Sequence, residues 1–291
     1  SGTINYVTKR PTSYNTGDAT ISVGNYGSYT ATATQRGPLT RDGRVRYRIT
    51  GGWLSQDGWL GKGTDRNEYV KNNLVSGSVD WTISEKTEMR FDFGQFNHGR
   101  RGRGAAIIDP ATGKVWQGSI DGFNFATNWS YREGVAERFR ADIIHVFSPE
   151  LTAQFIYSIH SSDSSTLLAL ARRPVGGGLR IAEAPNYQTV GREAEYNDTS
   201  PIDETGLLDL TWSKNFGQIK NRVNAGFQYS HATSGRRIGS YTAPLPDLVL
   251  NNPSTYNPPR PSLASMTGTG PLITEQSGWT AYIQESVTLF K

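Results

Sequence analysis

Five arginines in two clusters are the residues of this chain best suited to bind a ligand. Arg100, Arg101 and Arg103 lie within a short Gly/Arg-rich stretch, and Arg172 and Arg173 are adjacent. A guanidinium is always charged and presents a planar fork of donors, so clustered arginines attract carboxylates, phosphates and other anions. We take these five as candidate ligand-binding residues, for an anionic ligand or for the phosphates of a lipid surface. The alternative interpretation is that these arginines are surface charges that face solvent and bind no ligand.

Other residue types offer no reactive centre. The histidines His98, His145, His160 and His231 are not spaced as metal ligands, and the chain has no cysteine. The sequence contains no nucleophile elbow, dinucleotide-binding glycine pattern or phosphate-binding loop. Lys and Arg number 30 against 26 Asp and Glu, and a net charge of +4 is too small to favour nucleic acid as a partner. We predict that the chain is not an enzyme and has no catalytic residues, metal site or cofactor.

The segments that must position the arginines alternate apolar and polar residues with a period of two. Val45, Tyr47 and Ile49 are interleaved with Arg46 and Arg48. Successive side chains of a strand point to opposite faces, so each such segment has one apolar and one polar face. The pattern therefore predicts an all-β fold. The same alternation recurs in later segments around Phe91, Phe155 and Phe227.

About nine long strands follow from this pattern. The longest unbroken apolar run, Leu167–Ala171, is far shorter than the ~18 residues of a membrane-spanning helix. Contact with a membrane would therefore have to use strands. All 14 prolines fall outside the predicted strands, as expected for a residue that cannot donate to a β-ladder. The predicted spans are Asp18–Gln35, Arg44–Ser55, Val70–Ser84, Thr87–Asn97, Ala136–Phe147, Leu151–Ser162, Gly206–Lys214, Gln218–Ser230 and Gly278–Phe290.

The links between the predicted strands alternate in length. The short links are Arg36–Gly43, Glu85–Lys86, Ser148–Glu150 and Asn215–Gly217. The long links, which read as irregular, are Gln56–Tyr69, His98–Val135, Asp163–Thr205 and His231–Ser277. Short turns at one end and long loops at the other are typical of outer-membrane β-barrels.

This architecture predicts one antiparallel meander whose apolar residues share a convex face. Tyr47, Phe91, Phe93, Phe155, Tyr157, Phe227 and Tyr229 should lie on that face, and Arg46, Arg48, Arg90, Asp92, Arg222 and Gln228 on the concave one. Five tryptophans would then form interfacial girdles, with packing in a soluble sandwich as the alternative. They are Trp53, Trp59, Trp81, Trp212 and Trp279.

The sharpest local motif is Gly2–Pro11, which reads GTINYVTKRP. It resembles the run G-x-I-N-x-V-T-K-x-P at the end of the plug domain of TonB-dependent siderophore receptors, where the plug leads into the barrel. The resemblance continues with Ala19–Gln35 as the first barrel strand, the turn around Gly37 and Asp42, and Tyr47–Gly51 as the second strand. Trp279–Leu289 is similar to a later strand of the same barrel.

The resemblance implies that residues 1–11 are the last plug strand and residues 12–291 the N-terminal part of the barrel. Transporters of this class have about 22 strands around a plugged lumen, so we expect a fragment whose sheet does not close, with edges near Asp18–Gln35 and Gly278–Phe290. The implied location is the outer membrane of a Gram-negative bacterium. The implied partners are a ferric siderophore, which carries the only iron, outer-membrane lipid or lipopolysaccharide, and the TonB–ExbB–ExbD complex through the missing N-terminal region.

The implied function is TonB-dependent uptake of a ferric siderophore, with the arginine clusters attracting an anionic ferric chelate or lipopolysaccharide phosphates. Uptake of another ligand, such as cobalamin or an oligosaccharide, is the first alternative. A passive porin or an adhesin is the second, although a passive pore needs no plug. A soluble carbohydrate-binding module is the third, and the alternating link lengths argue against it.

Overall fold

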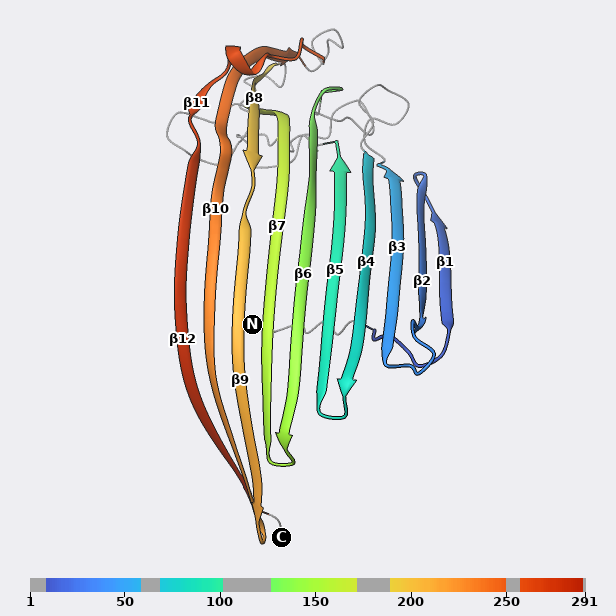
Figure 1. The fold of residues 1–291 in the computed structure, drawn as a ribbon. Coiled ribbons are helices and arrows are strands. Elements are labelled where there is room, and N and C mark those ends of the chain that lie inside the picture. The colour runs from blue at the N-terminus through green and yellow to red at the C-terminus, as the bar shows by residue number, and fades with distance from the viewer. Residues whose placement is uncertain (1–8, 59–68, 102–126, 172–188, 250–256, 290–291) are drawn as a thin grey trace.

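The structure is a computed structural model, and it describes residues 9–58, 69–101, 127–171, 189–249 and 257–289. These residues form one antiparallel sheet of 12 strands (Figure 1). Among them, no helix has the length and apolar character needed to cross a membrane. The all-β prediction is confirmed.

Strands β1 to β7 pair in chain order. β8 and β9 lie end to end between β7 and β10. β8 pairs with the C-terminal half of β10, and β9 pairs with its N-terminal half. β11 and β12 lie on the other side of β10 in the same way. The bounds are β1 Thr16–Gly24, β2 Ser28–Pro38, β3 Val45–Asp57, β4 Tyr69–Ser84, β5 Thr87–Arg100, β6 Tyr131–Ser148, β7 Leu151–Ala171, β8 Thr189–Thr199, β9 Ile202–Phe216, β10 Ile219–Val249, β11 Thr267–Thr269 and β12 Leu272–Leu289, with a short 3-10 helix, η3, at Leu263–Ser265.

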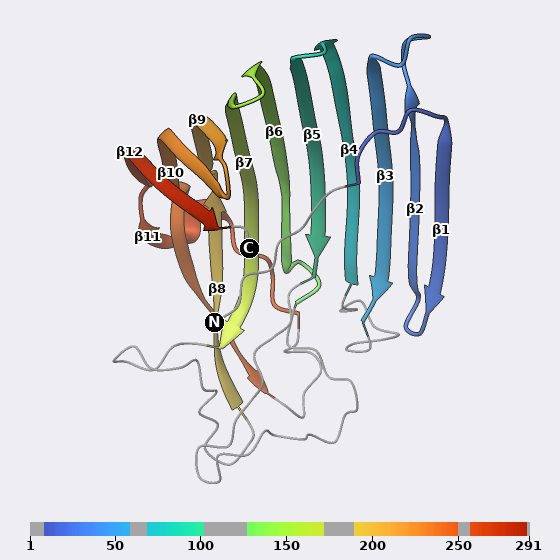
Figure 2. The same cartoon turned by 90° about the horizontal axis from the view of Figure 1, so that it is seen from below.

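The sheet is an open, curved wall (Figures 1 and 2). Every pairing joins antiparallel neighbours, which confirms the predicted meander. Among the described residues, β1 pairs only with β2 and β12 only with β10, so the sheet does not close on itself. The two open edges lie where they were predicted, at the first strand and near residue 280.

The prediction of a single strand over Asp18–Gln35 is wrong. The segment is a hairpin in which β1 and β2 pair from Thr16 opposite Arg36 to Gly24 opposite Ser28. Tyr26 and Gly27 adopt φ values of 57° and 62° in the turn, and the Ser28 amide donates to the Asn25 carbonyl at 3.2 Å. Two successive left-handed residues make the type of turn that matches strand twist in a hairpin. The likeness of Ala19–Gln35 to one barrel strand therefore covers two strands here.

Several strands are longer than predicted. β7 and β10 continue into links expected to be irregular, and β8 lies wholly inside such a link. Pro38, Pro244 and Pro246 consequently fall within strands, contrary to the prediction. Pro38 is the last residue of β2, and Pro244 lies beyond the β11 pairing, so β10 is paired there only to β8. Proline is tolerated at such edge positions because no neighbour requires its missing N–H.

The predicted alternation of link lengths holds with one exception. Links of 85–86, 149–150 and 217–218 and the turn 39–44 lie at one end of the sheet. The strand ends that the links 58–68, 101–130, 172–188 and 250–266 join lie at the other. The exception is the turn 25–27 of the first hairpin, which is short although it lies at the end with the long links.

The ladders confirm the predicted division of residues between the two faces. Tyr47 faces Val79, which faces Phe91, and the same row continues across the sheet to Tyr157, Tyr229 and Trp279. The predicted polar residues form rows on the other face, because side chains alternate along each strand. Trp53, Trp81, Trp212 and Trp279 all belong to the apolar face, whereas Trp59 lies outside the described residues.

The apolar face is the more exposed of the two. Phe93, Phe155 and Phe227 are 47%, 44% and 48% exposed, whereas Asp80 and Asp142 of the polar face are 4% and 6% exposed. Side chains diverge on the convex side of a curved sheet and converge on the concave side. The apolar face is therefore convex and the polar face concave, as predicted.

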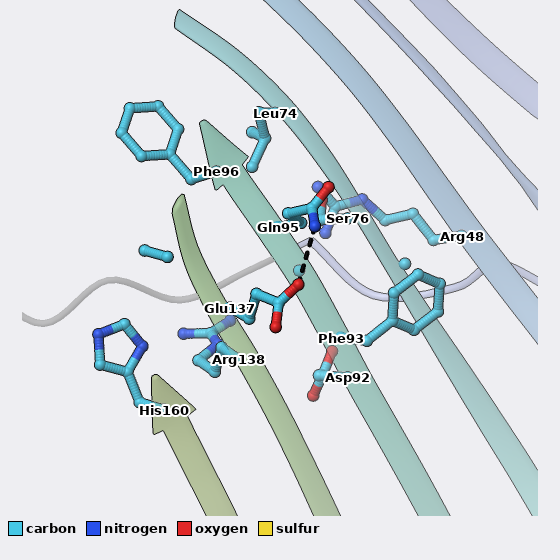
Figure 3. Close-up of a pocket in the computed structure, with 13 residues that line it drawn as sticks. Arg48, Leu74, Ser76, Asp92, Phe93, Gln95, Phe96, Glu137, Arg138 and His160 are labelled. Carbon is cyan, nitrogen blue, oxygen red and sulfur yellow. Dashed lines mark hydrogen bonds between the residues drawn. The ribbon is translucent and has the colours of Figure 1, made fainter. Parts of the chain in front are cut away.

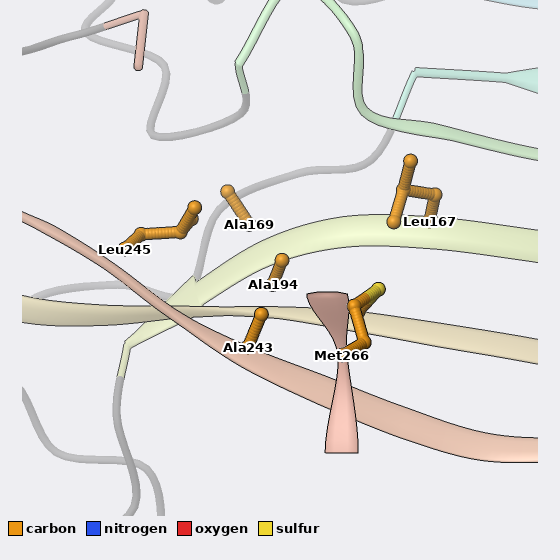
Figure 4. Close-up of a cluster of buried hydrophobic side chains, with 6 residues drawn as sticks. All are labelled: Leu167, Ala169, Ala194, Ala243, Leu245 and Met266. Atoms are coloured by element: carbon orange, nitrogen blue, oxygen red, sulfur yellow. The ribbon is translucent and has the colours of Figure 1, made fainter. Parts of the chain in front are cut away.

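Among the described residues, the buried apolar side chains form one small cluster (Figure 4). It joins the far ends of β7, β8 and β10 with the residue that follows η3, and Trp129 and Tyr131 pack against it. The Trp129 indole N–H donates to the Pro258 carbonyl at 2.8 Å, so two separate links meet there. Its members are Leu167, Ala169, Ala194, Ala243, Leu245 and Met266.

We expect arginine to be tolerated on the concave face and not on the convex one. Phe155 and Gln154 are neighbours on β7 that belong to opposite faces, and Gln154 lies opposite Asp209. For the protein folded into lipid vesicles, Phe155→Arg should lower the free energy of unfolding by ~2–4 kcal/mol, the usual cost of a cation on the lipid side of a barrel. Gln154→Arg should leave it nearly unchanged. Urea titration measures both, and an equal loss for the two variants would refute the assignment of the faces.

The turn 39–44 is held by a carboxylate that accepts two hydrogen bonds. The Thr40 hydroxyl donates to Asp42 Oδ1 at 2.6 Å, and the Arg44 amide donates to the same oxygen at 3.1 Å. The Thr40 bond, followed by the amide bond, lowers the pKa of Asp42 below its ordinary value. Gly43 adopts a φ of 70° next to it, a conformation that favours glycine.

The lowered pKa of Asp42 predicts a pH-dependent contribution to stability. Because the folded state holds the carboxylate more acidic than the unfolded state, the stabilisation is present above the unfolded pKa and is lost as pH falls through the folded pKa. Asp42→Asn should therefore be less stable than the wild type near neutral pH, and the difference should shrink as pH falls through the folded pKa. Urea midpoints measured from neutral to acidic pH test this. Glu85→Gln, in another turn, serves as the control and should show no such convergence.

Candidate functional site: the concave polar face

The half of the concave face near the short turns carries a network of ion pairs. Asp80 lies 3.9 Å from Arg46 and 3.8 Å from Arg10. Arg46 also lies 3.8 Å from Glu88, which accepts a hydrogen bond from Arg90 at 2.9 Å. Asp80 is nearly fully buried, so its two arginine partners offset much of the cost of removing its charge from water. Arg46, Asp80, Glu88 and Arg90 come from β3, β4 and β5, so they meet only once these three strands pair in register.

A second ion pair extends this network to β6. Arg140 donates to both carboxylate oxygens of Asp142 at 2.8 and 3.1 Å. The two residues are two positions apart on one strand and therefore share a face. Two-pronged arginine–carboxylate contacts are the stronger kind of charged hydrogen bond. The cations of this half of the concave face are thus largely neutralised by neighbouring acids.

The N-terminal segment of the described chain crosses this face. Arg48 Nη1 donates to the Lys9 carbonyl at 3.0 Å, the Arg10 guanidinium reaches Asp80, and Pro11 is buried. Residues 9–11 are the described part of the segment predicted to end a plug domain. The predicted residues 1–8 lie outside the described residues.

Beyond the network lies a hollow of about 360 Å³ in the middle of the wall (Figure 3). Arg48, Asp92, Arg138, His160 and Phe96 contribute side chains to it from β3, β5, β6 and β7. Arg138 and His160 are ladder partners and both are exposed. The Gln95–Glu137 hydrogen bond of 2.8 Å drawn in the figure joins residues of the opposite, convex face. The hollow can accept an anion through its arginines and a flat apolar group through Phe96.

The structure separates the predicted arginine cluster. Arg100 is exposed at the end of β5 on the concave face, opposite Arg132. Arg101 is the next residue and turns the other way, with its guanidinium 5.3 Å from the centre of the Tyr69 ring. The Lys71 ammonium lies 5.5 Å from the centre of the same ring. Tyr69 and Lys71 are alternate residues of β4 and lie on the convex face, as Val75 does further along the strand. Arg103, Arg172 and Arg173 lie outside the described residues.

Sequence reasoning missed Arg132, Arg138 and His160 as candidate site residues. Arg138 and Arg132 lie at alternate positions of β6, and this spacing in the sequence was the available signal. By itself this spacing indicates only a polar strand face, because cross-strand neighbours are known only from the register. Among the described residues, no group of three or more His, Asp or Glu side chains gathers as a metal site.

Known structures with the same fold were found across nearly the whole chain. The ferric preacinetobactin receptor BauA of Acinetobacter baumannii superimposes with a TM-score of 0.75 at 14% identity, over 97% of this chain and 40% of BauA. The ferric-catecholate import receptor Fiu of E. coli K12 gives 0.74 at 16% identity, over 98% and 40%. The pyoverdine outer membrane receptor FpvA of Pseudomonas aeruginosa gives 0.73 at 16% identity, over 95% and 39%.

The fold is that of part of a siderophore-receptor barrel. The chain spans about 40% of the length of these receptors, and the identities are too low for the match to say more than fold. No protein family model matches the sequence. In a partial barrel of this kind, the convex apolar face is the outer surface and the concave polar face lines the lumen.

We expect the buried carboxylate of Asp80 to fix the N-terminal segment to the wall. Asp80→Asn removes both ion pairs with little change of shape and should free Lys9 and Arg10 from the concave face. Because the chain has no cysteine, a single Lys9→Cys reports the change through its rate of maleimide labelling, which should rise several-fold in the Asp80→Asn background. Asp18→Asn is the control, since Asp18 is exposed and pairs with Arg36 at 4.0 Å on the same face. Equal labelling in all three proteins would show that the segment is held by other contacts.

Proposed function

We propose that this chain is part of the wall of an outer-membrane receptor that imports a ferric siderophore with energy supplied through TonB. Residues 12–291 then form the first part of the barrel, and residues 1–11 end a plug domain. In this proposal the protein lies in the outer membrane of a Gram-negative bacterium and performs no chemistry on its ligand. Its proposed partners are the siderophore, lipopolysaccharide and, through the region before the plug, the TonB–ExbB–ExbD complex.

The observation that carries the proposal is the N-terminal segment on the concave face. Lys9 and Arg10 are bound to Arg48 and Asp80 on the side of the wall that would line the lumen. A chain that enters the barrel wall from inside the lumen is the expected junction with a plug. A passive pore has no need of such a junction, which argues against the porin and adhesin alternatives.

Two further observations support the proposal. The convex face carries exposed aromatic and aliphatic side chains in continuous rows, as a lipid-facing surface requires. The three solved structures compared above are receptors for ferric preacinetobactin, ferric catecholates and pyoverdine. The choice of a siderophore over cobalamin or an oligosaccharide rests on the motif at Gly2–Pro11 and on these receptors.

Radiolabelled iron uptake tests the proposed function. Cells that carry the full-length gene should accumulate iron from at least one siderophore of a chemically varied panel, and deletion of either the gene or TonB should abolish that uptake. Labelled cobalamin is measured in parallel as the competing cargo. Uptake of every siderophore that is unchanged by both deletions would contradict the proposal, and TonB-dependent uptake of cobalamin alone would replace it with the alternative.

A further inference from the structure

The arginines of the concave face are neutralised at one end of the wall and not at the other. Arg46, Arg90 and Arg140 each lie within 4.0 Å of a carboxylate. Arg100, Arg132 and Arg138 lie nearer the end with the long links. No ion pair with a carboxylate and no hydrogen bond involves their guanidinium groups among the residues that the structure describes.

Arg100 and Arg132 face each other directly across the β5–β6 ladder. Their flanking partners in the same row are Val70 on β4 and Thr166 on β7, neither of which is charged. Like charges directly opposite each other destabilise a pair of strands. Both side chains are exposed, so an anion arriving from solvent can lie between them and offset the repulsion.

The cationic surface continues along the concave face toward the hollow. His98 is the next residue of β5 on this face, and its ring stacks on Phe96 at 5.9 Å and 21°. Arg138 and His160 follow at the hollow, which Arg48 borders from β3. The acids of this region are Asp92 and Glu137, which line the hollow, and Asp203, opposite His160. Glu193 and Glu195 of β8 also lie on the concave face, opposite Leu170 and Leu168 of β7.

Neighbouring acids of β6 do not neutralise the path. Glu133 and Glu137 alternate with Arg132 and Arg138 along the strand and therefore belong to the convex face. The path thus begins with two arginines, Arg100 and Arg132, that have no carboxylate partner among the described residues.

We propose that Arg100, Arg132 and Arg138 form an anion-guiding strip that leads a negatively charged ferric chelate from the mouth of the barrel to the hollow. The inference rests on the proposed function and narrows its substrate class to polyanionic chelates. A low-dielectric wall lined by charges of one sign concentrates the oppositely charged ligand and raises its association rate. The strip has no such effect on a neutral hydroxamate chelate, cobalamin or an oligosaccharide.

The test uses the full-length receptor in its own outer membrane and a panel of labelled chelates: an anionic ferric catecholate, ferric citrate and a neutral ferric hydroxamate. The wild type should take up an anionic member. The variant with Arg100→Gln and Arg132→Gln should bind it roughly tenfold more slowly at low ionic strength. The defect should shrink at high salt, which screens charges beyond a few ångströms.

Arg101→Gln is the matched control, because it removes the adjacent charge from the convex face. It should leave the association rate unchanged, and all variants should reach the same level in the membrane. The strip is overturned if Arg101→Gln slows binding as much as the double variant, if the double variant binds as fast as the wild type at low salt, or if the wild type takes up only the neutral chelate. Failure to bind any ferric chelate overturns the proposed function itself, so the two failures are distinct.

Discussion

An unpaired backbone amide inside hydrocarbon costs several kcal/mol, so a wall that crosses a membrane must satisfy each strand from both sides. The observed meander does this for every strand between β2 and β10 across the central part of the sheet. β1 and β12 each have one neighbour among the described residues, and in a bilayer their outer edges require further strands. The long uninterrupted ladders, the scarcity of proline within them and the short turns at one end all follow from this demand.

Pairing also fixes the register, and the register decides which side chains share a face. A shift of one residue would exchange the two faces of a strand, so a register that keeps the apolar residues on one face also keeps the charged residues on the other. Rows that run from Tyr47 to Trp279 remain apolar across strands far apart in the sequence. The same register brings Asp80 of β4 within reach of Arg46 of β3, a contact that neither strand specifies alone.

The sequence was sufficient for the architecture because period-two alternation is a local signal. The two faces of the strands followed from it, whereas the open sheet was expected from the family that the Gly2–Pro11 motif resembles, and the comparisons then found the fold of that family. Two features were not local. The Asn25–Gly27 turn was missed because the alternation resumes in the same phase after it. The far ends of β7 and β10 were missed because Leu167 and Leu245 are buried in a cluster whose members come from several predicted links.

The candidate site shows the same limit at the scale of single residues. Arg100 and Arg101 are adjacent and chemically identical, and composition gives no reason to separate them. The strand pleat turns one toward the other arginine of a concave pair and the other onto Tyr69 beside Lys71 on the convex face. A cation above an aromatic ring at the border of an apolar surface suits the phosphate region of a lipid leaflet. The two roles proposed for the cluster, attraction of an anionic chelate and contact with lipid phosphate, are therefore compatible, because the pleat places Arg100 and Arg101 on opposite faces.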